Sequence, residues 1–259
     1  MENLFLNYDH IAPQYNQRYP SSQLSERGQI LLELAKKVEA RNILEAGSGT
    51  GIWLNMLRSV TGGLYGLDYS MGMIRQAQMQ PSSLKLARGS AIRLPYQNDT
   101  FDLVYCVDAI HHFVDHQAFV AEAFRVLRPG GALAVIGFDP HDGATHWYIY
   151  DYFDGVYETD LRRYPSGTSL LAWMQRAGFQ NVSSQLAEHI LNVHAGDAVL
   201  KDPYLKHTST SQLALLSQSA YQAGIERIKA AIVAARTRDE KIVFRSDIPV
   251  MAYLGYKPE

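Results

Sequence analysis

The 259-residue sequence has little of three features that mark specialised classes of protein. A single cysteine, Cys106, excludes an intrachain disulfide and a zinc site built from several cysteines. The longest apolar runs, 132–136 and 230–235, are too short to cross a membrane. With 24 basic and 26 acidic side chains, the net charge is −2, which leaves no basic surplus for binding nucleic-acid phosphates. The first five residues lack the basic start and apolar stretch of a secretory signal, so we expect a cytoplasmic protein without a nucleic-acid partner.

The composition is otherwise that of a globular protein. Hydrophobic residues make up 47% of the chain and charged residues 19%, which suits one large domain with a sizeable core. Tyrosine is abundant, with 16 tyrosines against 9 phenylalanines. An apolar ring with a polar tip suits a pocket for an amphipathic ligand, and it equally suits half-buried surface.

Short apolar strands alternate with amphipathic helices in the first half of the chain. The spacing predicts strands over 42–46, 64–68, 84–87, 102–107 and 132–137, and helices over 24–40, 52–58, 70–79 and 117–127. Strands separated by helices are joined by parallel crossovers. Their uniformly apolar character agrees, because parallel strands are covered on both faces. We therefore predict a doubly wound α/β sheet.

The alternation breaks after Phe138. The stretch 146–164 holds five of the tyrosines and predicts one or two helices over the sheet. A helix over 169–177 is closed by Gly178, and 211–236 reads as one long helix with a bend at Gly224. The stretches 181–186 and 249–256 are candidates for a sixth and a last strand, which makes the segment between them an insertion.

The chemistry begins in the turn after the first strand, Glu45-Ala46-Gly47-Ser48-Gly49-Thr50-Gly51. Closely spaced glycines let backbone approach a ligand, although such a turn can also be a tight connection. A dinucleotide fingerprint would need a glycine where this chain has Ile52, which disfavours a nicotinamide oxidoreductase. Glu45 suits a cationic ammonium or sulfonium, and Asp68, at the end of the second strand, suits ribose hydroxyls. The expected ligand is a nucleoside with a positively charged arm.

Further blocks follow in order: Asp68-Tyr69-Ser70 with Met73, then 89–96, 101–104 and 125–131 (R-V-L-R-P-G-G). Together they resemble the class I S-adenosylmethionine-dependent methyltransferases, in the branch of ubiquinone and menaquinone biosynthesis methyltransferases. The resemblance implies S-adenosyl-L-methionine as cofactor and methyl transfer to an O, N or C atom of a small molecule. It implies a mostly parallel, seven-stranded Rossmann-like sheet with an N-terminal helical lid and a helical insertion before the last strand.

We expect a single methyltransferase domain, 1–259. Within it, 1–40 would form the helical lid, 41–140 the cofactor-binding core, 141–248 the acceptor-side helices and insertion, and 249–259 the last strand. The motifs do not separate an enzyme from a catalytically silent protein that binds the cofactor as a sensor or partner. They leave the oligomeric state open.

The resemblance also implies roles for matching residues. Tyr15 and Arg18 belong to a stretch similar to the family's lid helix and would close over the methionine carboxylate, unless this is a solvated amphipathic helix. Ser90 stands where the family usually has Asp, which would weaken adenine binding by about 1 kcal/mol. The expected cofactor-binding residues are Glu45, Gly47, Gly49, Thr50, Asp68, Tyr69, Ser90, Ala91, Val107, Asp108, Tyr15 and Arg18.

Methyl transfer needs a general base only if the acceptor loses a proton. His141, on the loop after the fifth strand, is the leading candidate. His111 and His112 follow the fourth strand, where a hydrogen-bonded structural role is the alternative. A metal site on His112 and His116 lacks a third ligand, so we expect no metal.

Two other segments are candidates for recognising the acceptor. The aromatic side chains of 146–164 are expected to form the acceptor wall, with plain lid packing as the alternative. Arg162 and Arg163 could recognise an acidic acceptor, although adjacent arginines on a helix usually face solvent.

Overall fold

A computed structural model describes residues 8–10, 21–79 and 83–259. Its described part contains a mixed sheet in the order β3-β2-β1-β4-β5-β8-β6, with β7 paired to β8. The first five strands are parallel, and β8 runs antiparallel to β5. The doubly wound, mostly parallel sheet is therefore confirmed, with one short strand more than expected. The strands are β1 (Asn42–Ala46), β2 (Gly63–Asp68), β3 (Lys85–Arg88), β4 (Phe101–Val107), β5 (Leu127–Phe138), β6 (His146–Trp147), β7 (Gln180–Ala195) and β8 (Val243–Tyr256).

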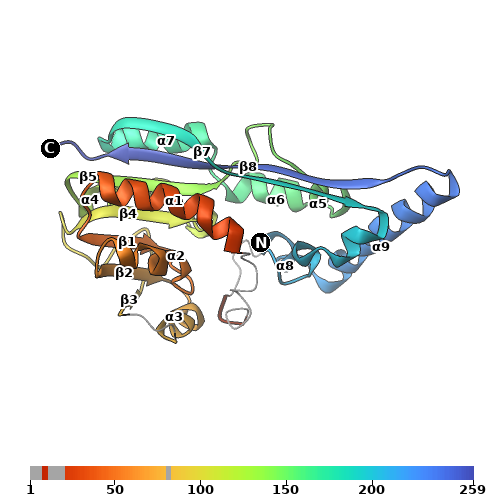
Figure 1. Ribbon diagram of the computed structural model, residues 1–259, viewed down its shortest axis with the longest axis horizontal. Coiled ribbons are helices and arrows are strands. Elements are labelled where there is room, and N and C mark those ends of the chain that lie inside the picture. Colours follow the sequence, from red (N-terminus) through yellow and green to blue (C-terminus); the bar gives the residue numbers. More distant parts are fainter. Residues whose placement is uncertain (1–7, 11–20, 80–82) are drawn as a thin grey trace.

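Helices cover both faces of the parallel part of the sheet, as Figure 1 shows. The α-helices are α1 (Ser21–Lys37), α2 (Ile52–Met56), α3 (Met71–Gln78), α4 (His116–Val126), α5 (Tyr148–Tyr152), α6 (Val156–Arg163), α7 (Gly167–Ala177), α8 (Ser211–Ala214) and α9 (Gln218–Thr237). The short 3-10 helices are η1 (Tyr8–His10), η3 (Leu57–Ser59), η4 (Ile110–His112), η5 (Gly196–Lys201) and η6 (Pro203–Leu205).

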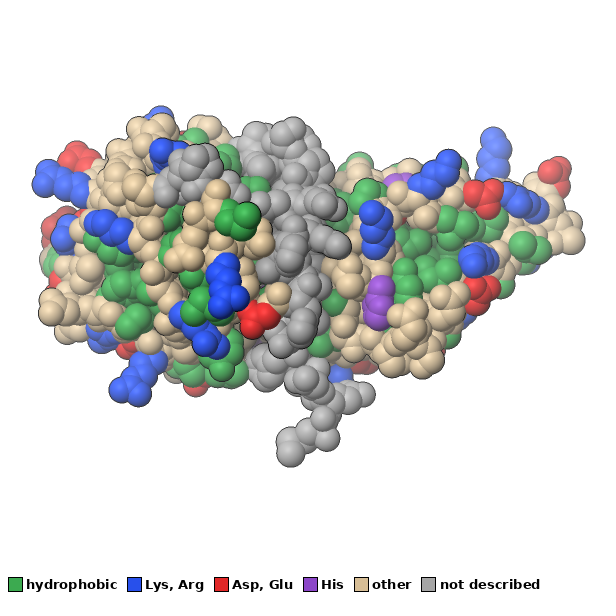
Figure 2. Space-filling model, turned by 90° about the horizontal axis from the view of Figure 1, so that it is seen from below, with side chains coloured by type: hydrophobic (Ala, Val, Ile, Leu, Met, Phe, Trp, Pro, Cys, Tyr) green, Lys and Arg blue, Asp and Glu red, His purple; other side chains and the backbone are tan. Residues whose placement is uncertain are grey.

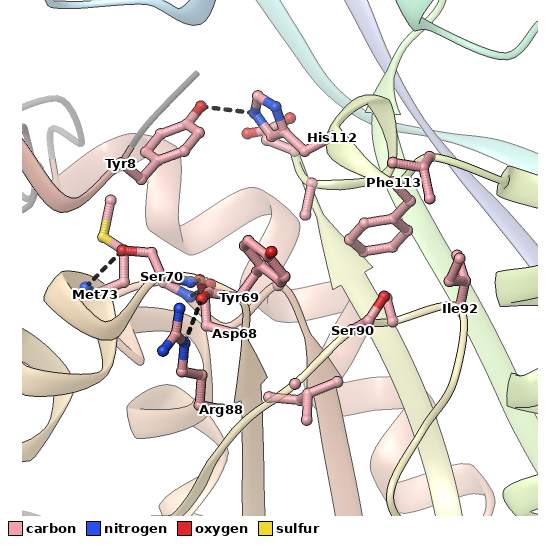
Figure 3. Close-up of a pocket in the computed structure, with 18 of the residues that line it drawn as sticks. Tyr8, Asp68, Tyr69, Ser70, Met73, Arg88, Ser90, Ile92, His112 and Phe113 are labelled. Atoms are coloured by element: carbon pink, nitrogen blue, oxygen red, sulfur yellow. Dashed lines mark hydrogen bonds between the residues drawn. The ribbon is translucent and has the colours of Figure 1, made fainter. Parts of the chain in front are cut away.

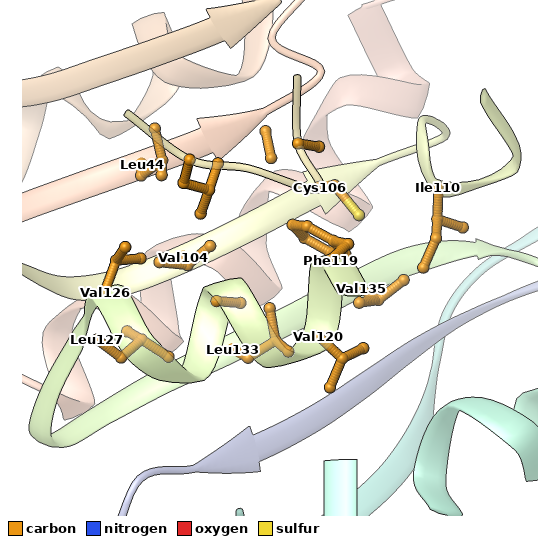
Figure 4. Close-up of a cluster of buried hydrophobic side chains, with 14 of the residues drawn as sticks. Leu44, Val104, Cys106, Ile110, Phe119, Val120, Val126, Leu127, Leu133 and Val135 are labelled. Atoms are coloured by element: carbon orange, nitrogen blue, oxygen red, sulfur yellow. The ribbon is translucent and has the colours of Figure 1, made fainter. Parts of the chain in front are cut away.

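Successive side chains of the parallel strands point to opposite faces of the sheet, and each face contributes to a separate core. In β4, Val104 and Cys106 face the core formed with α4 and α7, whereas Leu103 and Tyr105 face the core formed with α1 and α2. Figure 4 shows the first of these cores, with Cys106 buried in it. Two packed cores on one sheet hold the ends of the parallel strands in place.

A second lobe lies beside the parallel sheet, and β7 and β8 run through both lobes (Figure 1). The paired strands extend beyond the predicted 181–186 and 249–256, because the pairing continues to Ala195 and Val243. Under this ribbon, α5, α9 and η5 close a third core around Tyr148, Ile228 and Phe244. The segment predicted as an insertion therefore contributes to a core of its own. On the face shown in Figure 2, charged side chains of both signs are interspersed over the two lobes.

The prediction of a single helix over 211–236 was wrong. Helix α8 ends at Ala214, and a new helix begins after Ser217, whose hydroxyl accepts a hydrogen bond from the Ala220 amide (3.1 Å) and caps α9. Gly224 is not at this break. A Cβ there would lie 2.2 Å from the Phe153 ring, so the glycine allows α9 to approach α5 closely.

The stretch 146–164 also differs in detail from the prediction. It opens with the two-residue strand β6 and then forms two helices, α5 and α6. Most of its aromatic side chains are packed inside the lobe, with Tyr148 and Phe153 at the centre of the third core.

Candidate functional site

A large cavity, called the larger cavity below, lies where β1, β2 and β4 end. Its volume is about 730 Å³, within the range of small-molecule sites. Open α/β sheets bind ligands at the carboxyl ends of their strands, and this cavity has that position. Eight of the twelve residues predicted to bind the cofactor line it: Gly47, Gly49, Asp68, Tyr69, Ser90, Ala91, Val107 and Asp108.

The glycine turn shapes one wall of the larger cavity. Gly47 has φ +73° and Gly49 φ +51°, in the left-handed region that favours glycine. A Cβ on Gly47 would lie 2.6 Å from the Cβ of Ala109. The turn thus has no room for side chains at this point, and its bare backbone is presented to the cavity.

Asp68 is held at the end of β2 by backbone amides. One carboxylate oxygen accepts from the Gly49 amide (2.7 Å) and the other from the Ser70 amide (2.8 Å). Burial raises the pKa of Asp68 above its ordinary value, although these amide contacts oppose the rise. The side chain is therefore oriented before any ligand arrives.

Glu45 and Thr50 are buried, and neither lines the cavity. The Tyr105 hydroxyl donates a hydrogen bond to the Glu45 carboxylate (3.3 Å). Burial raises the pKa of Glu45 well above its ordinary value. The predicted contact of Glu45 with a ligand ammonium stays a prediction.

Tyr8 and His112 form the wall opposite Asp68, as Figure 3 shows. The Tyr8 hydroxyl and His112 Nε2 are 2.6 Å apart, and Nη2 of Arg163 lies 3.4 Å from His112 Nδ1. A guanidinium can only donate, so Nδ1 accepts and an uncharged ring donates from Nε2 to Tyr8. His112 thus positions Tyr8. The predicted lid residues Tyr15 and Arg18 lie outside the described residues.

Asp9 attaches η1 to the start of α3. Its Oδ1 accepts from the Ser70 hydroxyl (2.6 Å) and from the Gly72 amide (2.7 Å). This contact fixes Tyr8, the preceding residue, beside the cavity.

A smaller cavity, of about 150 Å³, adjoins the larger one. Tyr8 and Asp108 line both cavities, so these two residues mark the junction. The far side of the smaller cavity comes from the second lobe, through Trp147, Tyr164 and the segment Ser209–Gln212. Of the aromatic stretch predicted as an acceptor wall, Trp147 and Tyr164 line this cavity.

A buried charge network stands at the junction. The Arg27 guanidinium, from α1, contacts the carboxylates of both Asp108 and Glu188. Arg27 and Glu188 are buried, and Asp108 keeps part of its side chain exposed. Asp108 has φ +48°, unusual for a residue other than glycine, which turns the chain sharply at the end of β4.

The predicted histidines have three different surroundings. His111 lines the smaller cavity, stacks on Tyr164 (ring centroids 4.1 Å apart, planes at 14°) and lies 3.4 Å from the Ser211 hydroxyl. Burial lowers the pKa of His111 well below its ordinary value, so the ring is neutral. His141 is exposed, its Nε2 lies 2.9 Å from the Tyr164 carbonyl oxygen, and it lines neither cavity. The position of His141 gives no support to a role as base.

Arg162 and Arg163, considered above for recognising an acidic acceptor, have different surroundings on α6. Arg162 is exposed, and Arg163 is buried beside Asp160 (3.4 Å). Burial raises the pKa of Asp160 to about 6, while Arg163 opposes the rise. Since the Arg163 charge already faces a carboxylate, this pair is not a ready site for an acidic acceptor.

Sequence reasoning did not single out Arg27 or the segment Ser209–Gln212. No local pattern marks them, because Arg27 meets Glu188 across 161 positions and Ser211 meets His111 across 100. Tyr8 and Asp9 begin the stretch that resembles the family's lid helix and continues to Tyr15 and Arg18, but their contacts could not be read from the sequence.

Comparison with known proteins agrees with this geometry. Residues 44–135 match the family described as a methyltransferase domain. The demethylmenaquinone methyltransferase of Lactiplantibacillus plantarum is 28% identical over 210 residues, covering 69% of this chain and 88% of the relative. Residues 44–135 form a methyltransferase domain, and the enzyme is similar to the class I S-adenosylmethionine-dependent methyltransferases. The methyltransferase resembles those of quinone biosynthesis, and S-adenosylmethionine is its cofactor.

Solved structures share the fold of this methyltransferase. A candidate methyltransferase of an antibiotic biosynthesis pathway from Anabaena variabilis superposes with a TM-score of 0.69 at 23% identity, covering 88% of this chain and 95% of that one. Phosphoethanolamine N-methyltransferase 2 of Haemonchus contortus, solved with S-adenosyl-L-methionine, gives 0.60 at 16% identity, covering 97% and 57%. The nicotinamide oxidoreductase considered from the sequence is therefore the wrong class.

Two further findings concern the part of the methyltransferase that the structure describes. No helix in it is long and apolar enough to span a membrane. Its His, Cys, Asp and Glu side chains form no group of three that could hold a metal ion.

Proposed function

We propose that this methyltransferase binds S-adenosylmethionine in the larger cavity and transfers its methyl group to an O, N or C atom of a small molecule in the smaller cavity. The observation that carries the proposal is the junction: Tyr8 and Asp108 line both cavities. A methyl group can move between two adjacent sites only if donor and acceptor meet without water between them.

The residues around the larger cavity fit the cofactor. Its volume suits a nucleoside with an amino-acid arm, and the glycine turn at Gly47 and Gly49 lets that arm lie directly against backbone. Asp68 would accept from the ribose hydroxyls, and Tyr69 and Ser90 would flank the adenine. When bound, the cofactor supplies an electrophilic methyl group on a positively charged sulfur.

The junction residues orient the acceptor toward the cofactor site. Asp108 brings a carboxylate whose position Arg27 fixes, and that carboxylate would accept a hydrogen bond from an acceptor hydroxyl or amine. Tyr8, held by His112, would cover the same point from the side of η1. Both contacts exclude water from the place where the two cavities meet.

His111 is our candidate for receiving a proton when the acceptor must lose one. Its neutral ring lines the smaller cavity, and Nδ1 is buried with no hydrogen-bond partner among the described residues. A neutral imidazole can accept a proton without placing a positive charge beside a cationic donor beforehand.

The first test separates binding from transfer. Titration calorimetry should detect S-adenosylhomocysteine binding, and Asp68→Asn should weaken it at least tenfold, because each ribose hydrogen bond to a charged acceptor is worth about 1.5–3 kcal/mol. Asp154→Asn, at an exposed position outside both cavities, is the matched control. Binding of a nicotinamide dinucleotide in preference to S-adenosylhomocysteine would refute the cofactor assignment.

The second test asks for transfer. The protein is incubated with methyl-labelled cofactor and an extract of small metabolites, and label is expected in a small-molecule product. Tight cofactor binding with no transfer to any fraction would instead favour the silent binding protein.

A further inference from the structure

We infer that the methyl acceptor is a compact molecule built on one aromatic ring and carrying no negative charge. The inference rests on the proposed function, because it takes the smaller cavity as the acceptor site. Three properties of that cavity carry it: its volume, the state of the Arg27 guanidinium, and the uncharged polar groups on its far side.

The volume sets the size of the acceptor. A protein cavity of about 150 Å³ is large enough to hold benzene, and the smaller cavity has about this volume. Five aromatic side chains line it, from η1, the end of β5, the second lobe and η6, and they would pack on the faces and edges of one ring. They are Tyr8, Phe138, Trp147, Tyr164 and Tyr204.

The charge balance sets the sign of the acceptor. Among the described residues that line the smaller cavity, Arg27 is the one lysine or arginine. Its guanidinium already faces two carboxylates, Asp108 and Glu188. An acidic acceptor would have to compete with both for the same cation, or remain buried without a counter-charge. An uncharged or cationic acceptor meets no such cost.

Uncharged hydrogen-bonding groups on the far side would recognise the ring substituents. The Gln212 amide donates to the Tyr164 hydroxyl (3.0 Å), and both residues line the cavity. Ser211, the residue before Gln212, lies beside His111, with its hydroxyl 3.4 Å from His111 Nε2. These groups can exchange hydrogen bonds with a hydroxyl or amine, which makes Ser211 and Gln212 specificity-determining residues.

Three phenols with the same ring and a short side chain test the charge requirement. Tyrosol is neutral, tyramine is cationic and 4-hydroxyphenylacetate is anionic. Each is titrated calorimetrically into the full chain saturated with S-adenosylhomocysteine. We expect tyrosol and tyramine to bind at least tenfold more tightly than 4-hydroxyphenylacetate. Equal or tighter binding of the acid, or no binding by any of the three, would overturn the inference.

A larger acceptor tests the size requirement. A 1,4-naphthoquinol with a geranyl tail, representing a bicyclic acceptor with an isoprenoid chain, is expected to bind at least tenfold more weakly than tyrosol under the same conditions. Tighter binding of the tailed quinol would overturn the inference while leaving the proposed methyl transfer intact. The titration of S-adenosylhomocysteine alone is read separately, and its failure would instead remove the proposed function on which the inference rests.

Substitutions test whether the acceptor binds in the smaller cavity. Gln212→Leu should weaken tyrosol binding at least fivefold and leave S-adenosylhomocysteine affinity within twofold, whereas Gln222→Leu, on the exposed face of α9, should change neither. Ser211→Ala should also weaken tyrosol binding and leave S-adenosylhomocysteine affinity unchanged. Because it changes the side-chain volume less, it replaces Gln212→Leu if that variant does not fold. Unchanged tyrosol affinity in the folded variants would contradict the assignment.

Discussion

Replacing Arg27 by methionine would leave two carboxylates at the junction without their counter-charge. Arg27 and Glu188 are both buried, with side-chain exposures of 5% and 6%. Removing one member of a buried ion pair typically costs about 3–5 kcal/mol, because the remaining charge stays out of water. For a chain of this length, that loss corresponds to a fall of about 10 °C in Tm.

The loss of stability in Arg27→Met should depend on pH. Burial raises the pKa of Glu188 above its ordinary value, while Arg27 opposes the rise. Without Arg27 the carboxyl pKa rises further in the folded state. The neutral form is then favoured on folding, so the stability of the variant falls as the pH rises through that pKa. The deficit relative to the parent should therefore be larger at pH 8 than at pH 5.

Urea unfolding followed by circular dichroism at both pH values measures the effect. Arg238→Met is the matched control, because Arg238 and its partner Glu240 are 62% and 57% exposed and should contribute less than about 1 kcal/mol. The double variant Arg27→Met/Glu188→Met should recover much of the loss, since apolar side chains can replace a buried pair. A loss under about 1 kcal/mol for Arg27→Met, equal at both pH values, would refute the reasoning.

Three further outcomes are expected. Asp160 has a pKa raised to about 6 in the folded protein, so the unmodified protein should lose up to about 3 kcal/mol of unfolding free energy between pH 4 and pH 7, as this carboxyl ionises. Urea unfolding at the two pH values measures this loss, and the Asp160→Asn variant should not show it. Gly47→Ala should lower both Tm and S-adenosylhomocysteine affinity, because the new Cβ would clash with Ala109. Gly143→Ala is the control: Gly143 has a similar φ and no atom within 4 Å of the new Cβ, so this variant should lose only about 1–2 kcal/mol of unfolding free energy and keep its affinity. Ser90→Asp should tighten S-adenosylhomocysteine binding up to about fivefold in calorimetry, and weaker binding would count against Ser90 as the adenine contact.

The parallel sheet and the larger cavity could be predicted because their signals are local. A buried strand such as 42–46 is continuously apolar, and the glycine turn follows it within a few residues. The carboxyl ends of parallel strands then meet at one edge, so Asp68 and Ser90 could be placed beside the turn from the sequence alone.

The second lobe and the smaller cavity could not be predicted in the same way. The outer part of β7 alternates between exposed and half-buried positions, but apolar Leu191 and Val193 occupy exposed ones, so the sequence pattern does not mark this part as a strand and its pairing with β8 is decided by contacts distant in sequence. The charge network likewise joins α1, the end of β4 and β7. His141 was chosen from its place in the loop order, but the Tyr164 carbonyl holds its ring outside both cavities.

Ala195 and Val243 are partners across the β7–β8 ribbon, so the chain between them leaves the sheet and returns at adjacent points. This segment, residues 196–242, contains Ser211 and Gln212, whereas the glycine turn and Asp68 lie in the rest of the chain. Lengthening a loop between fixed ends costs little, about 0.6 kcal/mol for each doubling. Residues 196–242 can therefore change in length between fixed ends, provided that α9 and η5 still pack on α5 and Phe244, and under the proposed function such changes would alter the acceptor side and leave the donor side intact.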